Sequence, residues 1–253
     1  MQSSALTGWI FSSLFLSLRV SPVFALAPPF SLTRVPTPFR AFFGVAIAAC
    51  IAAADPAMAT IRDFSAGALV VMAARELMLG AIFVMAFQLM FGALYMAGRT
   101  IDIQAGYGLA LLIDPATQAQ TPLVGTIFAY AAGAVFFAMG GHVELLKILA
   151  ASVHAIPLGA AGPPLSLDRL ASFLSVVFLT AFGVGGGAIL SLFLADIGIA
   201  ALARTAPQMN ALVLGFQVKT LLLLTILPLT LGFAGALLAR LAAYTLESLP
   251  GLL

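Results

Sequence analysis

The chain has 253 residues, of which 62% are hydrophobic and 8% are charged. Because a soluble domain carries roughly 25% charged residues, this composition predicts a protein of the membrane, or of a large assembly that hides its surface. The formal net charge of +2, with no run of basic residues, argues against binding to nucleic acid. A single cysteine, Cys50, excludes an internal disulfide and a metal site built from several cysteines.

The N-terminal part of the chain contains two apolar segments, residues 5–26 and 39–54, joined by a proline-rich turn. Arg19 and Pro22 interrupt the first segment. Because no Lys or Arg precedes its apolar run, we do not expect a cleaved signal peptide. The second segment is shorter than the roughly 20 residues of a transmembrane helix, so a buried or re-entrant helix is expected there.

The next apolar segment, residues 64–96, is too long for one simple crossing and contains Arg75 and Glu76. Neighbouring residues point to different faces of a helix, so these two side chains are not expected to pair with each other. Charges at membrane depth usually face protein or water, which favours contacts between helices or between subunits. The sequence leaves open the alternative of two helices that place both charges near the surface.

Residues 97–122 form the one long stretch in which polar and helix-breaking residues cluster. Gly106 and Gly108 favour an irregular backbone, and Asp114-Pro115 disfavours a helix. Irregular backbone at membrane depth is tolerated where protein buries it or where it lines water, so the apolar tip of this stretch is a candidate channel seal. An ordinary loop is the alternative. The predicted plug residues are Gly106, Tyr107, Gly108, Leu109, Leu111, Leu112, Ile113, Asp114 and Pro115.

Three further apolar segments follow, at residues 122–141, 170–195 and 221–239, and a Gly/Pro linker at 156–164 marks the clearest internal boundary. With about six such segments, the chain is predicted to be an all-α, polytopic membrane-associated protein of kinked helical hairpins. Lys and Arg fall singly in nearly every connection, so the positive-inside rule gives no orientation and a non-standard topology is expected. Kinks are expected at Pro22, Pro207 and near Pro228, and a close helix contact at residues 185–187.

No set of residues predicts an enzyme. His142 and His154 lack the spacing and the carboxylate of an HExxH zinc site, and no Ser/His, His/Glu or His/Asp pair has convincing catalytic spacing. We therefore expect no catalytic residue, cofactor or metal. The residues expected to make polar contacts between helices or subunits are Arg75, Glu76, Arg99, Asp102, Gln104, Arg204, Gln208, Asn210 and Lys219.

Several strings, in this order along the chain, resemble the FliR family, the flagellar export-gate membrane protein with a counterpart in the injectisome of type III secretion. The strings are Arg19, Pro22 and Phe24; PTPFR at 36–40; Arg75-Glu76 with Gly80; AGRTIDIQAGYGLALLIDP at 97–115; GGHVELLKILAAS at 140–152; and RTAPQMNALVLGFQVK at 204–219. One departure is Gln217, which stands where the family pattern has a proline. The resemblance covers nearly the whole chain.

The resemblance implies one integral-membrane unit, residues 1–253, with a FliP-like half at 1–160 and a FliQ-like half at 161–253. It implies a non-enzymatic subunit that assembles with FliP-like and FliQ-like partners and with an FlhB-type switch protein of the same apparatus. Together they would form the inner-membrane channel through which unfolded proteins leave the bacterial cytoplasm, with residues 106–122 as its plug.

The resemblance implies a role in a flagellar basal body, where the protein is required for flagellum assembly, or in an injectisome base. The sequence does not decide between the two, although the strings at 97–115 and 204–219 favour the flagellar one. The alternative function is a secondary membrane transporter with discontinuous helices. A transporter of that kind is expected to show an internal repeat, and we find no convincing one.

Overall fold

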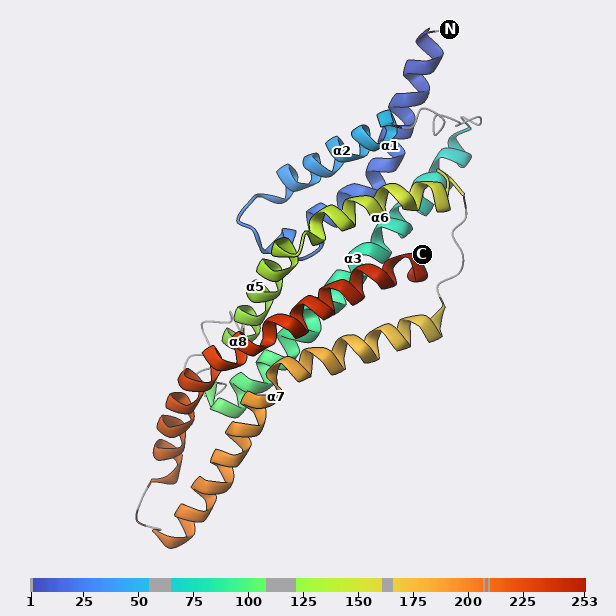
Figure 1. Cartoon of the computed structure of the whole chain (residues 1–253). Helices are drawn as coiled ribbons and strands as arrows, with labels where there is room; N and C mark the ends of the chain where they lie inside the picture. Colours follow the sequence, from blue (N-terminus) through green and yellow to red (C-terminus); the bar gives the residue numbers. More distant parts are fainter. Residues whose placement is uncertain (1, 55–64, 108–121, 161–165, 207, 209) are drawn as a thin grey trace. The chain divides into compact units, whose positions relative to one another are not determined.

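The computed structural model describes residues 2–54, 65–107, 122–160, 166–206, 208 and 210–253. All regular structure in these residues is helical, as Figure 1 shows. The prediction of an all-α fold is confirmed, since the described residues contain no strand. The elements are α1 (Gln2–Leu26), the short 3₁₀ helix η1 (Phe30–Leu32), α2 (Thr37–Ala54), α3 (Ala66–Ala105), α5 (Leu123–Ala138), α6 (Gly141–Ala155), α7 (Leu167–Thr205) and α8 (Ala211–Leu252).

Within the described residues, 5 helices are long and apolar enough to cross a membrane, and the bent pair α5 and α6 makes up to 6. The prediction of about six apolar segments is thus confirmed. Of the two alternatives expected for α2, a helix buried within the chain is wrong: only 17% of α2 is buried, and Phe39, Phe42 and Phe43 on it are exposed. Its apolar surface is left for lipid or for another protein to cover, and a re-entrant helix stays a prediction.

Helix α3 is one continuous helix of 40 residues, so the alternative of two helices for residues 64–96 is wrong. It also continues to Ala105, well into the polar stretch that starts at residue 97. Arg99 and Gln104 have good helix propensity and are compatible with this continuation. The irregular backbone begins only at Gly106, whose positive φ of 91° suits a residue without a side chain.

The helices that contain Pro22 and Pro228 are continuous through these residues. Pro22 lies inside α1, which continues to Leu26, and α8 runs through Pro228 while changing direction along its length (Figure 1). Pro207 lies outside the described residues. A Cβ built on Gly185 would lie 3.1 Å from the Ile101 side chain, which confirms a close helix contact there. No atom of the described chain lies within 4 Å of a Cβ at Gly186 or Gly187, so the contact does not extend to them.

The chain forms two compact units, each assembled from separate stretches of sequence. Unit 1 contains Met1–Leu89, Phe136–Leu174 and Ala243–Leu253, and unit 2 contains Met90–Val135 and Ser175–Ala242. Their limits differ from the halves 1–160 and 161–253. Those halves describe likeness to two other proteins rather than contacts within this chain, so they remain a prediction.

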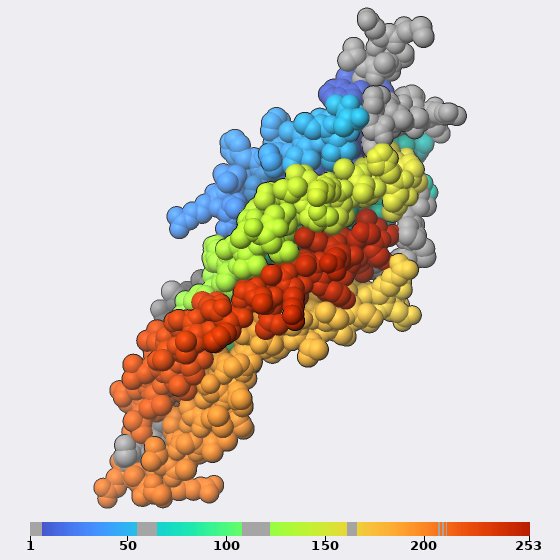
Figure 2. Space-filling view, in the orientation of Figure 1, coloured from blue at the N-terminus to red at the C-terminus, as the bar shows by residue number. Residues whose placement is uncertain are grey.

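Unit 1 is built around closely packed helices and a phenylalanine core. A Cβ on Gly44 of α2 would lie 2.5 Å from the Ser21 backbone of α1, so the two helices touch along their backbones. Phe24 and Phe136 are buried in the interior of the unit, and the half-buried Phe30 contacts both rings, with the ring centroids of Phe24 and Phe30 4.8 Å apart. Figure 2 shows α2 and α6 side by side on one face of this unit.

Candidate functional site

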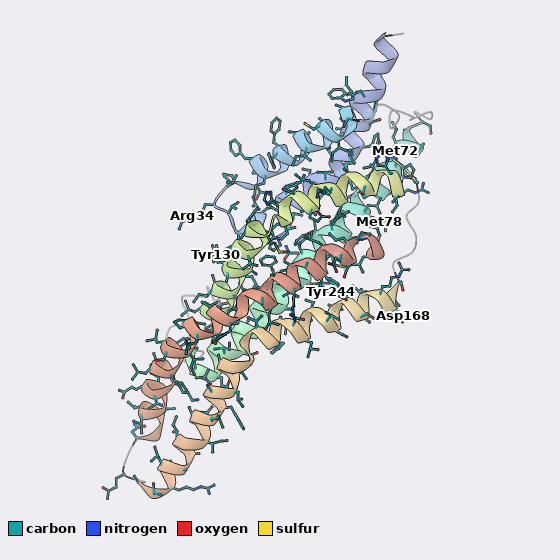
Figure 3. All side chains as sticks on the ribbon, in the orientation of Figure 1. Arg34, Met72, Met78, Tyr130, Asp168 and Tyr244 are labelled. Carbon is teal, nitrogen blue, oxygen red and sulfur yellow. The ribbon has the colours of Figure 1, made fainter. Side chains whose placement is uncertain are left out.

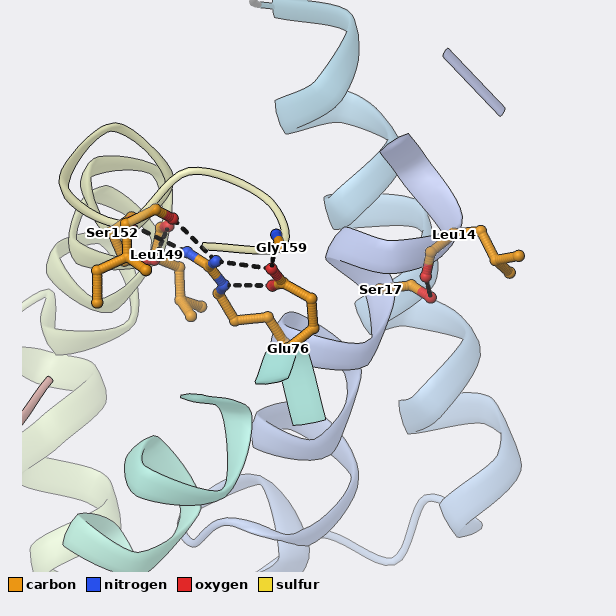
Figure 4. A network of polar contacts seen from close by, with 8 residues as sticks. Leu14, Ser17, Glu76, Leu149, Ser152 and Gly159 are labelled. Atoms are coloured by element: carbon orange, nitrogen blue, oxygen red, sulfur yellow. Dashed lines mark hydrogen bonds and ion pairs between the residues drawn. The ribbon is translucent and has the colours of Figure 1, made fainter. Parts of the chain in front are cut away.

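A buried ion pair joins α1 to α3 inside unit 1. Arg19 is 1% exposed and Glu76 is 0% exposed. The Arg19 Nε donates to Glu76 Oε2 at 2.7 Å, and Nη2 donates to Oε1 at 3.1 Å, so the pair is bidentate (Figure 4). A buried charge is costly unless it is paired and fully hydrogen-bonded, and this geometry meets the first condition.

The rest of the Arg19 guanidinium is bonded to the C-terminal end of α6. Nη1 donates to the carbonyl and hydroxyl oxygens of Ser152, at 3.0 and 3.2 Å, and Nη2 also donates to the Ile156 carbonyl at 3.0 Å. Each of the N–H groups of the side chain therefore has an acceptor. The last carbonyls of a helix lack partners and carry partial negative charge, so a cation is favourable there.

Glu76 and its neighbour Arg75 also hold the turn that follows α6. Glu76 Oε1 accepts from the Gly159 N–H at 3.0 Å, and Arg75 Nη1 donates to the Gly159 carbonyl at 2.6 Å. Arg75 and Glu76 thus do not pair with each other, because adjacent residues point to different faces of a helix; both bond to Gly159 instead. We name Arg19, Glu76, Ser152, Ile156 and Gly159 the Arg19 cluster; it fixes α1, α3 and α6 to one another.

The sequence did not identify Arg19 as the partner of Glu76. It showed Arg19 as an interruption of an apolar segment and as part of a string shared with the FliR family, and it showed residues 156–164 only as a linker. The signal was nevertheless present: a cation in one apolar helix, and an acid in another that cannot pair with the adjacent Arg75, each need a partner away from lipid. Nothing in the local spacing tells which of the other helices supplies that partner.

A second polar site lies in unit 2, around the two ends of the segment predicted to be a plug. Helices α3 and α5 touch there through two glycines: a Cβ on Gly98 would overlap the Gly125 backbone. The carboxylate of Asp102, which is 6% exposed, accepts the Val124 N–H, and that nitrogen lies 3.2 Å from each carboxylate oxygen. Asp102 thereby satisfies one of the free N–H groups at the start of α5, in the manner of an N-cap supplied by another helix.

The end of α3 is bonded to α7 and α8 as well. Lys219 Nζ on α8 donates to the Gln104 carbonyl at 3.0 Å and forms an ion pair with Asp196 of α7. The Gln104 side-chain amide meets α7 with both of its polar atoms. When it is oriented with its nitrogen toward the Ile189 carbonyl, the nitrogen donates to that carbonyl at 3.3 Å and the oxygen accepts from the Phe193 N–H at 3.2 Å. A lysine at the end of a helix is favourable because it meets free carbonyls and the negative end of the dipole.

We name this group of residues the loop base: Gly98, Asp102, Gln104, Val124, Gly125, Asp196 and Lys219. Of the predicted plug residues, only Gly106 and Tyr107 lie in the described part of the chain. Tyr107 makes an edge contact with Phe216 of α8, with ring centroids 6.4 Å apart. Gly108, Leu109, Leu111, Leu112, Ile113, Asp114 and Pro115 lie outside the described residues.

The remaining residues predicted to make polar contacts are exposed. Asn210 Oδ1 accepts the Val213 N–H at 3.3 Å, which is an ordinary N-cap of α8. Arg99, Arg204 and Gln208 make no hydrogen bond or ion pair with the described part of the chain. The structure therefore brings Asp102, Gln104 and Lys219 together and leaves these others on the surface. Across the described ranges, no group of three or more His, Cys, Asp or Glu residues could hold a metal ion.

The sequence is similar to bacterial export proteins over most of its length. The family model described as "Bacterial export proteins, family 1" matches residues 10–244. The flagellar biosynthetic protein FliR of Bacillus subtilis (strain 168) is 28% identical over 248 residues, which cover 95% of this chain and 93% of the relative. The FliR protein of Escherichia coli (strain K12) is 29% identical over 202 residues, covering 79% and 76%.

A relative that is not named FliR matches a shorter part of the chain. Yop proteins translocation protein T of Yersinia pestis is 28% identical over 161 residues, which cover 62% of either chain. The matched family model extends across both units and includes both the Arg19 cluster and the loop base. The resemblance inferred from the sequence is confirmed, and the protein belongs to the family of bacterial export proteins, family 1.

Proposed function

We propose that this protein is a subunit of a type III protein export apparatus in the bacterial inner membrane. It assembles there with FliP-like and FliQ-like subunits and with an FlhB-type switch protein, and together they form the channel for unfolded export substrates. The names of the relatives, which refer to flagellar biosynthesis and protein translocation, support this proposal. It is a structural role and requires no catalytic group.

The exposed apolar surface of α7 and α8 supports a place in an assembly. Leu179 is 78% exposed and Phe233 is 83% exposed, and Arg240 is exposed on α8 as well. Lipid alone covers such leucine and phenylalanine side chains well, but an arginine within an apolar helix needs a polar or charged partner. Neighbouring subunits satisfy both needs.

We further propose that residues 106–122 plug the channel. The observation that carries this proposal is the loop base. Asp102 and the contact of Gly98 with Gly125 bring the ends of the segment together, and Lys219 and Gln104 bind that base to α7 and α8. Because this segment is held at both ends, its apolar tip can enter the channel without further contacts to the helices. An apolar tip closes a narrow pore by excluding water.

Deletion of residues 109–113 tests the plug in cells. It removes the apolar tip and leaves Tyr107 and every residue of the loop base in place. We expect normal recovery of the complex together with leakage of ions and small solutes across the membrane. If these residues were only a structural loop, the deletion would reduce recovery of the complex without a leak.

Co-purification tests the export-apparatus role separately. A channel subunit is expected to leave the membrane with small hydrophobic partner proteins of the FliP and FliQ kinds. Recovery of this chain alone, or only with copies of itself, would favour the alternative of a secondary transporter. This outcome does not depend on whether residues 106–122 form a plug.

A further inference from the structure

A pocket with several polar side chains in a mainly apolar lining lies within unit 1, where the first turns of α7 meet the end of α8. Its volume is about 320 Å³. The polar side chains that line it are Asp168, Arg169, Ser172, Tyr244 and Ser248. Figure 3 shows Asp168 at the beginning of α7 and Tyr244 on α8. Neither the Arg19 cluster nor the loop base contributes a residue to this pocket, so the roles proposed for them leave it unexplained.

The charged side chains of the pocket are only partly used by the protein itself. Arg169 Nη1 donates to the Gly251 carbonyl at 2.7 Å, which ties the guanidinium to the end of α8 and leaves its other N–H groups for a ligand. Asp168 forms no hydrogen bond or ion pair with the described part of the chain. The rings of Phe173 and Tyr244 are stacked in one wall, with centroids 5.9 Å apart.

The position of the pocket, at the start of the apolar run of α7, favours the headgroup region of a membrane. Asp168 and Arg169 are the last charged residues before a long uncharged run, and α7 is one of the helices able to cross a membrane. Charged side chains at the end of an apolar helix, and tyrosines near them, lie at the interface between hydrocarbon and water. A ligand held at such an interface meets water on one side and hydrocarbon on the other.

We propose that this pocket binds the headgroup of a zwitterionic phospholipid. The phosphate accepts hydrogen bonds from Arg169 and from the hydroxyl groups, as guanidinium groups bind phosphate well. The cationic amine of the same headgroup lies against Asp168, and the apolar wall at Phe173 receives the start of the acyl chains. The headgroup of phosphatidylglycerol carries no cationic group to pair with Asp168, so the pairing of opposite charges favours a headgroup that has an amine over that lipid. The proposal requires membrane insertion and is independent of the export role.

Native mass spectrometry tests the proposal on the full-length protein, purified together with whatever subunits stay bound to it. The complex is reconstituted with phosphatidylethanolamine, phosphatidylcholine or phosphatidylglycerol, extracted in mild detergent, and its retained lipid is counted. We expect a zwitterionic lipid to be retained at least about tenfold more than phosphatidylglycerol, a ratio that corresponds to about 1.4 kcal/mol. Soluble phosphoethanolamine should compete at high concentration, whereas inorganic phosphate alone should not. Competition by phosphate alone would show a free anion site instead of a lipid site.

Two substitutions and one control complete the test. Arg169→Met should abolish retention of all three lipids, and Asp168→Asn should remove the preference for zwitterionic lipid while retention persists. Arg34→Met, an exposed arginine between η1 and α2 and outside the pocket, should change neither. Equal retention by Arg169→Met and Arg34→Met would overturn the proposal, because the bound lipid would then be a general surface layer. If Arg169→Met fails to assemble, Asp168→Asn decides alone, and an unchanged lipid preference in that variant overturns the proposal.

Discussion

Replacement of Glu76 by glutamine removes one charge from the Arg19 cluster and nearly preserves its shape. The glutamate side chain accepts hydrogen bonds from Arg19 Nε, Arg19 Nη2 and the Gly159 N–H. A glutamine offers one oxygen, and its amide nitrogen would face donors. Arg19, at 1% exposure, would keep its charge without a counterion. Breaking a buried ion pair on one side costs about 3–5 kcal/mol, so Glu76→Gln should lower the free energy of unfolding by about that amount.

The matched control is Glu144→Gln on α6. Glu144 pairs with Lys147 at 3.1 Å, but the two side chains are 53% and 68% exposed. Such an exposed pair contributes only about 0.2–0.5 kcal/mol. The free energy of unfolding of both variants is measured by unfolding the purified proteins with a denaturing detergent. The loss of the helical circular dichroism signal monitors the unfolding. Equal effects of the two substitutions would refute the assigned role of the Arg19 cluster.

A charge reversal gives a second, stricter measurement at the same cluster. In the double variant Arg19→Glu with Glu76→Arg the two charges are still opposite, so a simple ion pair would be restored. The Arg19 guanidinium, however, also bonds to the carbonyl groups of Ser152 and Ile156 at the end of α6. A glutamate at position 19 would repel those carbonyls, so we expect the double variant to be no more stable than Glu76→Gln. Full rescue would show that only the pair matters and that α6 is not held by Arg19.

Two more substitutions test the loop base. Gly98→Ala should prevent the close contact of α3 with Gly125 and reduce recovery of the complex. The control is Gly92→Ala on the same helix, where an added Cβ has no neighbouring atom of the described chain within 4 Å. This variant should have unchanged stability or be more stable by up to about 1 kcal/mol. Lys219→Met removes the bond to the Gln104 carbonyl and the ion pair with Asp196. It should lower stability by about 1–3 kcal/mol and allow small solutes to leak, while Gln217→Leu, an exposed residue of the same helix, should do neither. Equal behaviour within either pair of variants would contradict the packing described for the loop base.

The apolar pattern of the sequence predicts the helices of this protein well. Hydrophobic runs of spanning length are a strong signal, because each must be helical to satisfy its backbone in a membrane. The polar residues at 97–105 were a weaker guide. Arg99, Asp102 and Gln104 looked like part of a loop, yet α3 continues through them, since polar side chains are compatible with a helix and only Gly106 ends it.

The contacts that hold the helices together could not be predicted from the sequence. Arg19 and Glu76 are 57 positions apart, and Arg19 and Ser152 are 133 apart. Lys219 meets the Gln104 carbonyl across 115 positions. Local patterns show that a buried charge needs a partner, but the choice of partner depends on which helix faces which. The sequence therefore marked Glu76, Asp102, Gln104 and Lys219 as contact residues without naming what they contact.

Single-channel recording from the purified complex in a planar bilayer tests the central proposal most directly. The wild-type complex should be closed to ions, and the complex that lacks residues 109–113 should show discrete conductance steps. Both preparations must contain this protein and its partner subunits in the same proportion. A fully assembled deletion complex that stays closed, or a wild-type complex that conducts as much as the deletion, would contradict the proposal that residues 106–122 seal an export channel.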